Sequence, residues 1–324
     1  MMLSHARTAV VSGIAGVVLA GVIALPQLGQ APAESVRTVT AEAVSPREGC
    51  RRAPRPEGDD WTRFGTSLST SSLTFAQALD AQQRKYGRLR AVRVFDPGIP
   101  PSNAWENRAP VLGRRLVLTS FRMPPAEVLA GTYDAALLHF FRTAPRKGKV
   151  LWNYLHEPEP HILAGTFTAR EYRRAFRRIV DLATHACRKN LFPTLVLTGW
   201  TSMPESGRDW RDYYPGARYI SVLAWDPYNS ASRVPTSYAA PRDLFGPLVR
   251  IAEETGKPFG IAETGSVIVA GDDGTGRAEW LTRVGRYLTR KQALFVTYFD
   301  STRDGHYRLD DAASIAAWRA WVQS

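Results

Sequence analysis

Short apolar runs and longer amphipathic stretches alternate along the chain from Trp61 to the C-terminus. The short runs are rich in Val, Leu, Ile and aromatic residues and are bounded by Gly, Pro or Asp, which is typical of buried strands. They predict eight strands, at residues 63–67, 91–95, 116–120, 150–157, 194–198, 219–225, 258–262 and 293–299. In the longer stretches apolar residues recur at helical spacing. These predict helices at residues 75–86, 133–142, 169–189, 241–255, 276–290 and 312–322.

The alternation of strands and helices predicts an α/β protein with a parallel sheet. Eight such units in a chain of this length predict a (β/α)₈ TIM barrel, formed as a single domain by residues 59–324. No G-x-G-x-x-G sequence follows the first strand, which argues against a dinucleotide-binding fold. The second and fifth connections show no clear helical pattern.

The N-terminal residues have a different character. Residues 9–25 are apolar and uncharged, follow a weakly basic start and precede the small-residue sequence Ala31-Pro32-Ala33. This order predicts that residues 1–33 are a secretory signal peptide and that the protein is secreted. An uncleaved anchor through residues 9–25, with the protein facing outside, is the alternative. Residues 34–58 are polar and rich in Pro, Glu and Arg, which predicts a disordered linker.

The basic charge does not indicate a nucleic-acid partner. The net charge is +12, but 36 of the 42 basic residues are Arg and they are scattered along the chain. The densest run, residues 170–178, lies on a predicted helix and is interpreted as a solvated face. The charge fits weak adhesion to an anionic polymer better than nucleic-acid binding. We expect the protein to be a monomer.

Two cysteines in an exported chain permit one disulfide. We therefore predict that Cys50 and Cys187 are bridged, which would tie the linker to the end of a helix. Two unrelated thiols are the alternative.

The predicted barrel indicates where functional residues should lie. In this fold they stand at the C-terminal ends of strands and on the loops that follow. The polar and aromatic residues at those positions are Asp96, His156, Glu157, Trp200, Asp226, Tyr228, Glu263, Tyr298 and Asp300. Trp152, Trp225 and Trp280 are interpreted as packing residues.

Glu157 ends the fourth predicted strand and Glu263 follows the seventh. A carboxylate at the end of a buried strand is costly to desolvate, so it usually has a partner or a task. These two lie on strands that face each other and can converge over the barrel mouth. Retaining glycosidases need two carboxyls about 5–5.5 Å apart. The alternative is that both glutamates pair with barrel arginines such as Arg63, Arg93 or Arg122.

This arrangement resembles the glycoside hydrolases of clan A, which carry an acid/base Glu after strand four and a nucleophile Glu after strand seven. The dipeptide His156-Glu157 resembles family 26, the β-mannanase family. The residues 158–161 that follow differ from the Gly and aromatic run usual in family 26 mannanases. The resemblance implies an endo-β-mannanase-like glycosidase (O-glycosyl hydrolase) and leaves mannan, mixed-linkage glucan and β-1,3-xylan as alternative substrates.

The resemblance implies that Glu157 is the acid/base and Glu263 the nucleophile of a double displacement, which needs no cofactor. Tyr228 is expected to donate a hydrogen bond to Glu263, with Arg93 as a second donor.

Two of the other site candidates, His156 and Asp226, have two interpretations each. His156 orients the sugar or the acid/base, or it is a hydrogen-bonded histidine in the barrel wall. Asp226 is a sugar hydroxyl acceptor or a turn-former. Trp200 and Tyr298 are candidate sugar-binding platforms, and Asp300 beside Tyr298 is a candidate polar contact.

Two motif-like sequences are not interpreted as sites. The spacing of His156, Glu157 and His161 resembles a zinc-binding helix, but Pro158 and Pro160 forbid that helix. Residues 271–276 lack the Lys-Ser/Thr of a phosphate loop and are interpreted as a turn. We therefore expect no metal. A non-catalytic carbohydrate-binding or cell-surface protein on a degenerate barrel is the alternative to an enzyme.

Overall fold

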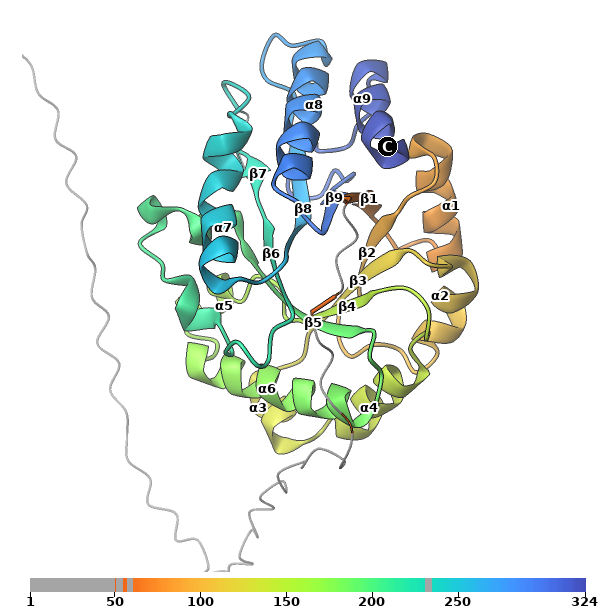
Figure 1. Cartoon of the computed structure of the whole chain (residues 1–324), viewed down its shortest axis with the longest axis vertical. Coiled ribbons are helices and arrows are strands. Elements are labelled where there is room, and N and C mark those ends of the chain that lie inside the picture. Colours follow the sequence, from red (N-terminus) through yellow and green to blue (C-terminus); the bar gives the residue numbers. More distant parts are fainter. Residues whose placement is uncertain (1–49, 51–54, 57–60, 231–234) are drawn as a thin grey trace, which may run out of the picture. The chain divides into compact units, whose positions relative to one another are not determined.

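A computed structural model describes residue 50, residues 55–56, residues 61–230 and residues 235–324. Its strands are β1 Arg63–Ser67, β2 Ala91–Phe95, β3 Leu116–Phe121, β4 Val150–Tyr154, β5 Leu191–Thr198, β6 Val222–Asp226, β7 Tyr228–Asn229, β8 Phe259–Ser266 and β9 Phe295–Tyr298. All of them pair in parallel. β1 pairs with β9, and β6 pairs with β8, so the sheet closes into a barrel (Figure 1). The two-residue strand β7 pairs with the end of β8 alone.

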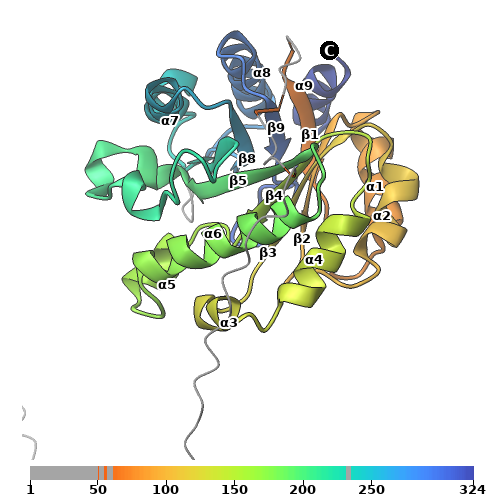
Figure 2. The same cartoon turned by 60° about the horizontal axis from the view of Figure 1, so that its bottom comes forward.

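Helices surround the barrel (Figures 1 and 2). They are α1 Phe75–Tyr86, α2 Ala104–Leu112, α3 Pro125–Ala130, α4 Asp134–Thr143, α5 Glu159–Leu163, α6 Ala169–His185, α7 Pro241–Thr255, α8 Thr275–Arg290 and α9 Ala312–Gln323. Short 3₁₀ helices follow β5, at η1 Gly199–Ser202, η2 Pro204–Ser206 and η3 Trp210–Tyr213. The predicted (β/α)₈ barrel is therefore confirmed.

The element boundaries follow from local signals where those signals are strong. α1 and α6 begin at the capping boxes Thr74/Gln77 and Thr168/Glu171, which satisfy the first free backbone N–H groups. The connections with no clear helical pattern are the irregular ones. α2 contains Pro110, and the chain after β5 forms only 3₁₀ turns before β6. β4 ends at Tyr154, earlier than predicted, so Glu157 lies on a loop.

Side chains alternate between the two faces of the barrel strands. Residues such as Val92, Trp152 and Trp225 face the helices and join the large outer core. Leu118, Leu151 and Ala224 belong to a separate cluster made of strand residues and their immediate neighbours, which fills the barrel interior. The predicted packing role of Trp152, Trp225 and Trp280 is confirmed, since all three are almost fully buried.

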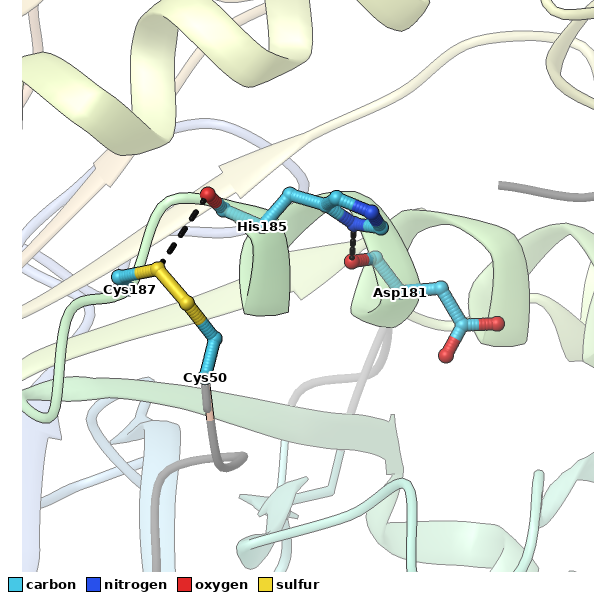
Figure 3. Close-up of a disulfide and its surroundings, with 4 residues drawn as sticks. All are labelled: Cys50, Asp181, His185 and Cys187. Carbon is cyan, nitrogen blue, oxygen red and sulfur yellow. Dashed lines mark hydrogen bonds between the residues drawn. A yellow bond between two sulfur atoms is a disulfide. The ribbon is translucent and has the colours of Figure 1, made fainter. Parts of the chain in front are cut away.

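Cys50 and Cys187 form the predicted disulfide, with Cα atoms 5.2 Å apart (Figure 3). Cys187 lies just beyond the C-terminus of α6 and is exposed, so it is not a buried helical thiol. The predicted signal peptide, the membrane anchor and most of the linker lie outside the described residues. Within those residues, no helix has the length and apolar character needed to cross a membrane.

Candidate active site

Arg93 is the centre of a buried charged cluster at the C-terminal mouth of the barrel. It lies on β2, and its side chain is completely buried. Its Nη1 donates to Asp226 Oδ1 at 2.8 Å and lies 3.3 Å from Glu263 Oε1. Its Nε and Nη2 have no hydrogen-bond partner among the described residues. One guanidinium is thus shared by carboxylates from β6 and β8.

A β-bulge aims Glu263 into this cluster. Along β8, Ile261 packs in the outer core and Ala262 in the barrel interior, so plain alternation would turn Glu263 toward the helices. The register with β9 shifts here, because Ile261 pairs with Val296 whereas Thr264 pairs with Tyr298. The extra residue on β8 re-aims the side chain, as bulges beside active sites commonly do.

Tyr228 holds Glu263 from a second side. Its hydroxyl donates a hydrogen bond to Glu263 Oε2. The short strand β7 fixes its position, since Tyr228 pairs with Gly265 on β8. The predicted contact of Tyr228 and Arg93 with Glu263 is therefore present. Two donors from different strands thus fix the position of the Glu263 carboxyl group.

Glu157 occupies a strained loop after β4. Leu155 and Glu157 adopt the left-handed conformation, with φ of 48° and 50°, which is rarely populated by residues other than glycine. The backbone is held by hydrogen bonds from Leu155 N to Phe121 O at 2.7 Å and from Glu157 N to Val196 O at 3.0 Å. Such strain clusters at functional sites.

The electrostatics of Glu157 differ from those of an ordinary surface glutamate. Burial raises the pKa of Glu157 to about 8, and the charges of Glu263 and Glu159 act in the same direction against Arg93. Burial also raises the pKa of Asp226, although the Arg93 guanidinium opposes this shift. Three carboxyls thus surround one guanidinium, and burial favours the protonated form of both Glu157 and Asp226.

His156 stays neutral in this site. Burial lowers the pKa of its imidazole well below the ordinary value, and the charges of Arg93 and Arg122 lower it further. The ring packs edge-on against Phe95, with centroids 5.2 Å apart. A neutral His beside Glu157 can donate or accept a hydrogen bond without adding charge. Trp200 lies on η1 and is 51% exposed, so its ring is accessible to a ligand.

Several predicted site residues have structural roles instead. Tyr298 is fully buried, donates to Tyr307 O at 2.7 Å and packs on Trp318, so its assignment as a sugar platform was wrong. Asp300 was also wrong, because its carboxylate accepts from Lys85 Nζ at 2.7 Å and from Leu309 N at 2.9 Å.

Asp226 and Asp96 are likewise bound by protein partners. The side chain of Asp226 has no exposed surface and pairs with Arg93 through Oδ1, whereas its Oδ2 has no hydrogen-bond partner among the described residues. Asp96 forms a two-point ion pair with Arg108, at 2.5 and 3.1 Å.

Two features of the site were missed from the sequence. Phe299, one residue after β9, is half-buried and packs edge-on against Tyr228, with centroids 6.0 Å apart. It has the opposite parity to Tyr298, and counting the strand alternation from Val296 would have indicated it. The other is Glu159, which begins α5 and is completely buried. No sequence signal marked it.

In the part of the chain that the structure describes, no group of three or more His, Cys, Asp or Glu side chains is arranged to hold a metal ion. Residues 271–274 form the turn before α8, and Asp272 in this turn accepts from Gly276 N at 2.8 Å and Arg277 N at 3.1 Å in the first turn of the helix.

Comparison with known proteins gives further evidence on the fold. No family model matches the chain, and no curated protein matches its sequence. Among solved structures it resembles the catalytic domain of the GH26 endo-β-1,4-mannanase of Bacillus sp. JAMB-750, with a TM-score of 0.58 and 12% identity over 82% of this chain and 86% of that one.

Two further structures give similar values. The modular endo-β-1,4-mannanase of Cellulomonas fimi has a TM-score of 0.55 and 15% identity, over 82% of this chain and 71% of that one. A glucosidase of Croceicoccus marinus has a TM-score of 0.57 and 14% identity, over 84% and 69%. The chain therefore has the (β/α)₈ barrel fold of these enzymes.

Proposed function

We propose that this protein is a retaining β-glycoside hydrolase in which Glu157 is the acid/base and Glu263 the nucleophile. The observation that carries the proposal is that the two carboxyls near Arg93 have different surroundings. Burial raises the pKa of Glu157 to about 8. Glu263 instead accepts a hydrogen bond from Tyr228 and forms an ion pair with Arg93. A carboxyl that keeps its proton, beside a second carboxyl positioned by hydrogen-bond donors, is the arrangement that an acid/base and a nucleophile require.

The proposed reaction has two steps. In the first, a Glu263 oxygen attacks the anomeric carbon while Glu157 gives its proton to the departing glycosidic oxygen. In the second, Glu157 removes a proton from water, the water oxygen attacks the same carbon and the bond to Glu263 breaks. Asp226 and Arg93 position the nucleophile from the barrel interior. Trp200 offers an apolar ring to a sugar face.

The substrate is proposed to be a β-linked polysaccharide of the plant or cell-wall type, such as mannan, mixed-linkage glucan or xylan. The support is the barrel fold shared with endo-β-1,4-mannanases and a glucosidase. Incubating the purified protein with mannan, mixed-linkage glucan, xylan and laminarin and measuring reducing ends tests this.

The test of the chemistry uses two variants. Glu263→Ala is expected to abolish release of reducing ends. Glu157→Ala is expected to regain activity when azide is added, with a substrate whose leaving group needs no protonation. Retention of polysaccharide without product by the unmodified protein would instead indicate a carbohydrate-binding protein. A carboxyl separation of about 6.5–9.5 Å in a crystal structure would indicate inversion.

Secretion is part of the same proposal. The support is the signal-like sequence of residues 1–33 and the Cys50–Cys187 disulfide, since disulfides persist in oxidising compartments. The mature protein should begin near Glu34, which amino-terminal sequencing of secreted material checks. Recovery of the intact chain only in membranes would favour the anchor through residues 9–25.

A further inference from the structure

Glu159 is a buried carboxylate that takes no part in the two proposed catalytic steps. Its Oε1 accepts hydrogen bonds from Thr198 N at 2.8 Å, Thr198 Oγ1 at 3.1 Å and Thr201 Oγ1 at 2.6 Å. Its Oε2 has no hydrogen-bond partner within the described part of the chain. A buried charge that keeps an unmet oxygen lowers stability. Its presence therefore suggests a role other than stabilising the fold.

The hydrogen bonds of Glu159 join two loops at the barrel mouth. Glu159 lies two residues after Glu157, where the loop that follows β4 ends and α5 begins. Thr198 ends β5 and caps η1, accepting a hydrogen bond from Thr201 N at 3.3 Å. η1 carries the exposed ring of Trp200. A single carboxylate is thus bonded to the start of the segment that holds this ring.

The basic residue Arg208 contacts the junction that Glu159 forms with Thr198 and Thr201. Arg208 Nη1 donates to the hydroxyl oxygens of Thr198 and Thr201, at 3.3 Å each. Its charge therefore polarises the two hydroxyls that donate to Glu159, which strengthens their bonds to the carboxylate. The junction extends from α5 through η1 to the residues before η3.

We propose that Glu159 is a positioning residue that fastens the loop of Glu157 to the loop of Trp200, so that the acid/base and the sugar-binding ring keep a fixed relation. This inference rests on the proposed glycosidase function. The left-handed backbone at Leu155 and Glu157 needs surrounding contacts to hold it, and the Glu159 junction supplies them on the C-terminal side. Its negative charge also acts on Glu157, since it helps to raise the pKa of that carboxyl.

Two substitutions separate the bonds from the charge. Glu159→Gln keeps an oxygen that accepts the three hydrogen bonds but removes the charge. It should move the alkaline limb of the kcat/KM profile to lower pH and leave the plateau near the unmodified value. Thr201→Val keeps the charge but removes one donor. It should lower kcat, by up to about 100-fold if the acid/base is displaced by about 1 Å.

The matched control is Glu205→Gln. Glu205 lies on η2 in the same segment and is exposed. Its substitution changes the net charge equally, so it should alter neither the pH profile nor kcat. A second readout needs no activity. In ¹³C-carboxyl-labelled protein the Glu157 signal, assigned by its loss in Glu157→Gln, should titrate at lower pH in Glu159→Gln than in the unmodified chain.

The outcomes of the two proposals are distinct. If the unmodified protein hydrolyses a polysaccharide but Glu159→Gln moves neither the pH profile nor the Glu157 titration, and Thr201→Val keeps full kcat, the positioning role is overturned and the glycosidase function stands. If no glycan is hydrolysed but the titration shifts as expected, the proposed function fails while the coupling of Glu159 to Glu157 stands.

Discussion

Two buried arginine–carboxylate clusters lie near the end of β2, and they are built differently. Arg108 on α2 meets Asp96 at two points, and Thr119 donates a further hydrogen bond to the same carboxylate at 3.3 Å. Arg93 on β2 shares a single Nη1 between Asp226 and Glu263 and leaves its Nε and Nη2 without hydrogen-bond partners among the described residues.

The charges of the two clusters differ as well. The first has one carboxylate for one guanidinium, whereas the second has Asp226, Glu263 and the nearby Glu157 for one guanidinium. A cluster whose groups are matched contributes to the fold. One with unmet donors and excess carboxyls is costly, and such cost is typical of sites that keep groups available for a ligand or a proton. The comparison therefore distinguishes a structural ion pair from the cluster that we propose as the catalytic site.

The largest difference is expected when each arginine is replaced by methionine. Arg93→Met should lower kcat/KM by about 10²–10³-fold, because Glu263 loses a charged donor. Arg108→Met should leave the activity of the folded protein near normal and lower the free energy of unfolding by about 3–5 kcal/mol, because Asp96 remains buried and unpaired. Polysaccharide hydrolysis and urea unfolding measure the two effects. Equal loss of activity in both variants would break the comparison.

The second prediction concerns pH and stability. The pKa of Glu157 is raised in the folded protein to about 8 from an ordinary value of 4.5. Between these values the folded state binds more protons than the unfolded state, so the free energy of unfolding falls as pH rises, by up to about 1.4 kcal/mol per pH unit. This contribution is fully present below the unfolded pKa and is lost as pH rises through about 8.

Glu157→Gln removes this proton equilibrium. Its free energy of unfolding should therefore decline less steeply than that of the unmodified protein when urea midpoints are compared at pH 5 and pH 8. Glu205→Gln is the control, since Glu205 is exposed on η2. Parallel pH dependence in Glu157→Gln and the unmodified chain would show that Glu157 does not hold a proton. The excess of carboxyls around Arg93 would then no longer support a catalytic role for this cluster.

The third prediction tests the donor on Glu263. Tyr228→Phe removes a hydrogen bond to a charged group, which is worth about 1.5–3 kcal/mol and corresponds to about 10- to 100-fold in kcat/KM. Tyr238→Phe is the matched control, because Tyr238 also donates its hydroxyl to a carboxylate, that of Asp272 near α8. Tyr238→Phe should change stability but not kcat/KM. Similar kinetic losses in both variants would contradict a specific role for Tyr228.

The sequence was sufficient to predict the barrel and the positions of Glu157 and Glu263 at one end of it, because both depend on local signals. The apolar alternation defines the strands, and a carboxylate at a strand end is recognisable by position. The contact of Tyr228 with Glu263 was predictable for the same reason, since residues at neighbouring strand ends meet at one mouth.

The errors came from side-chain direction, which position alone does not give. Tyr298 and Asp300 stand at a strand end but face the helices and Lys85. Conversely, the bulge in β8 turns Glu263 inward where simple alternation would turn it outward. Glu159 was missed because its three donors belong to Thr198 and Thr201, which are 39 and 42 residues further along the chain.

The smallest kinetic effect is expected at Trp200, which lies on η1 and is 51% exposed. If a sugar covers this ring, Trp200→Ala should raise KM by about tenfold, since burying roughly half of a large aromatic side chain is worth about 1.4 kcal/mol. It should leave kcat unchanged, because the ring takes no part in the two proposed catalytic steps. Trp61→Ala is the control. Trp61 is 41% exposed, but its ring is stacked by Arg63 and Arg90, with guanidinium carbons at 4.6 and 4.7 Å. A ring already covered by protein cations has less face to offer a sugar, so KM should not change there. An unchanged KM in Trp200→Ala would mean that exposure at the end of β5 does not indicate sugar binding. The interpretation of the unmet Arg93 donors in the barrel interior would be unaffected.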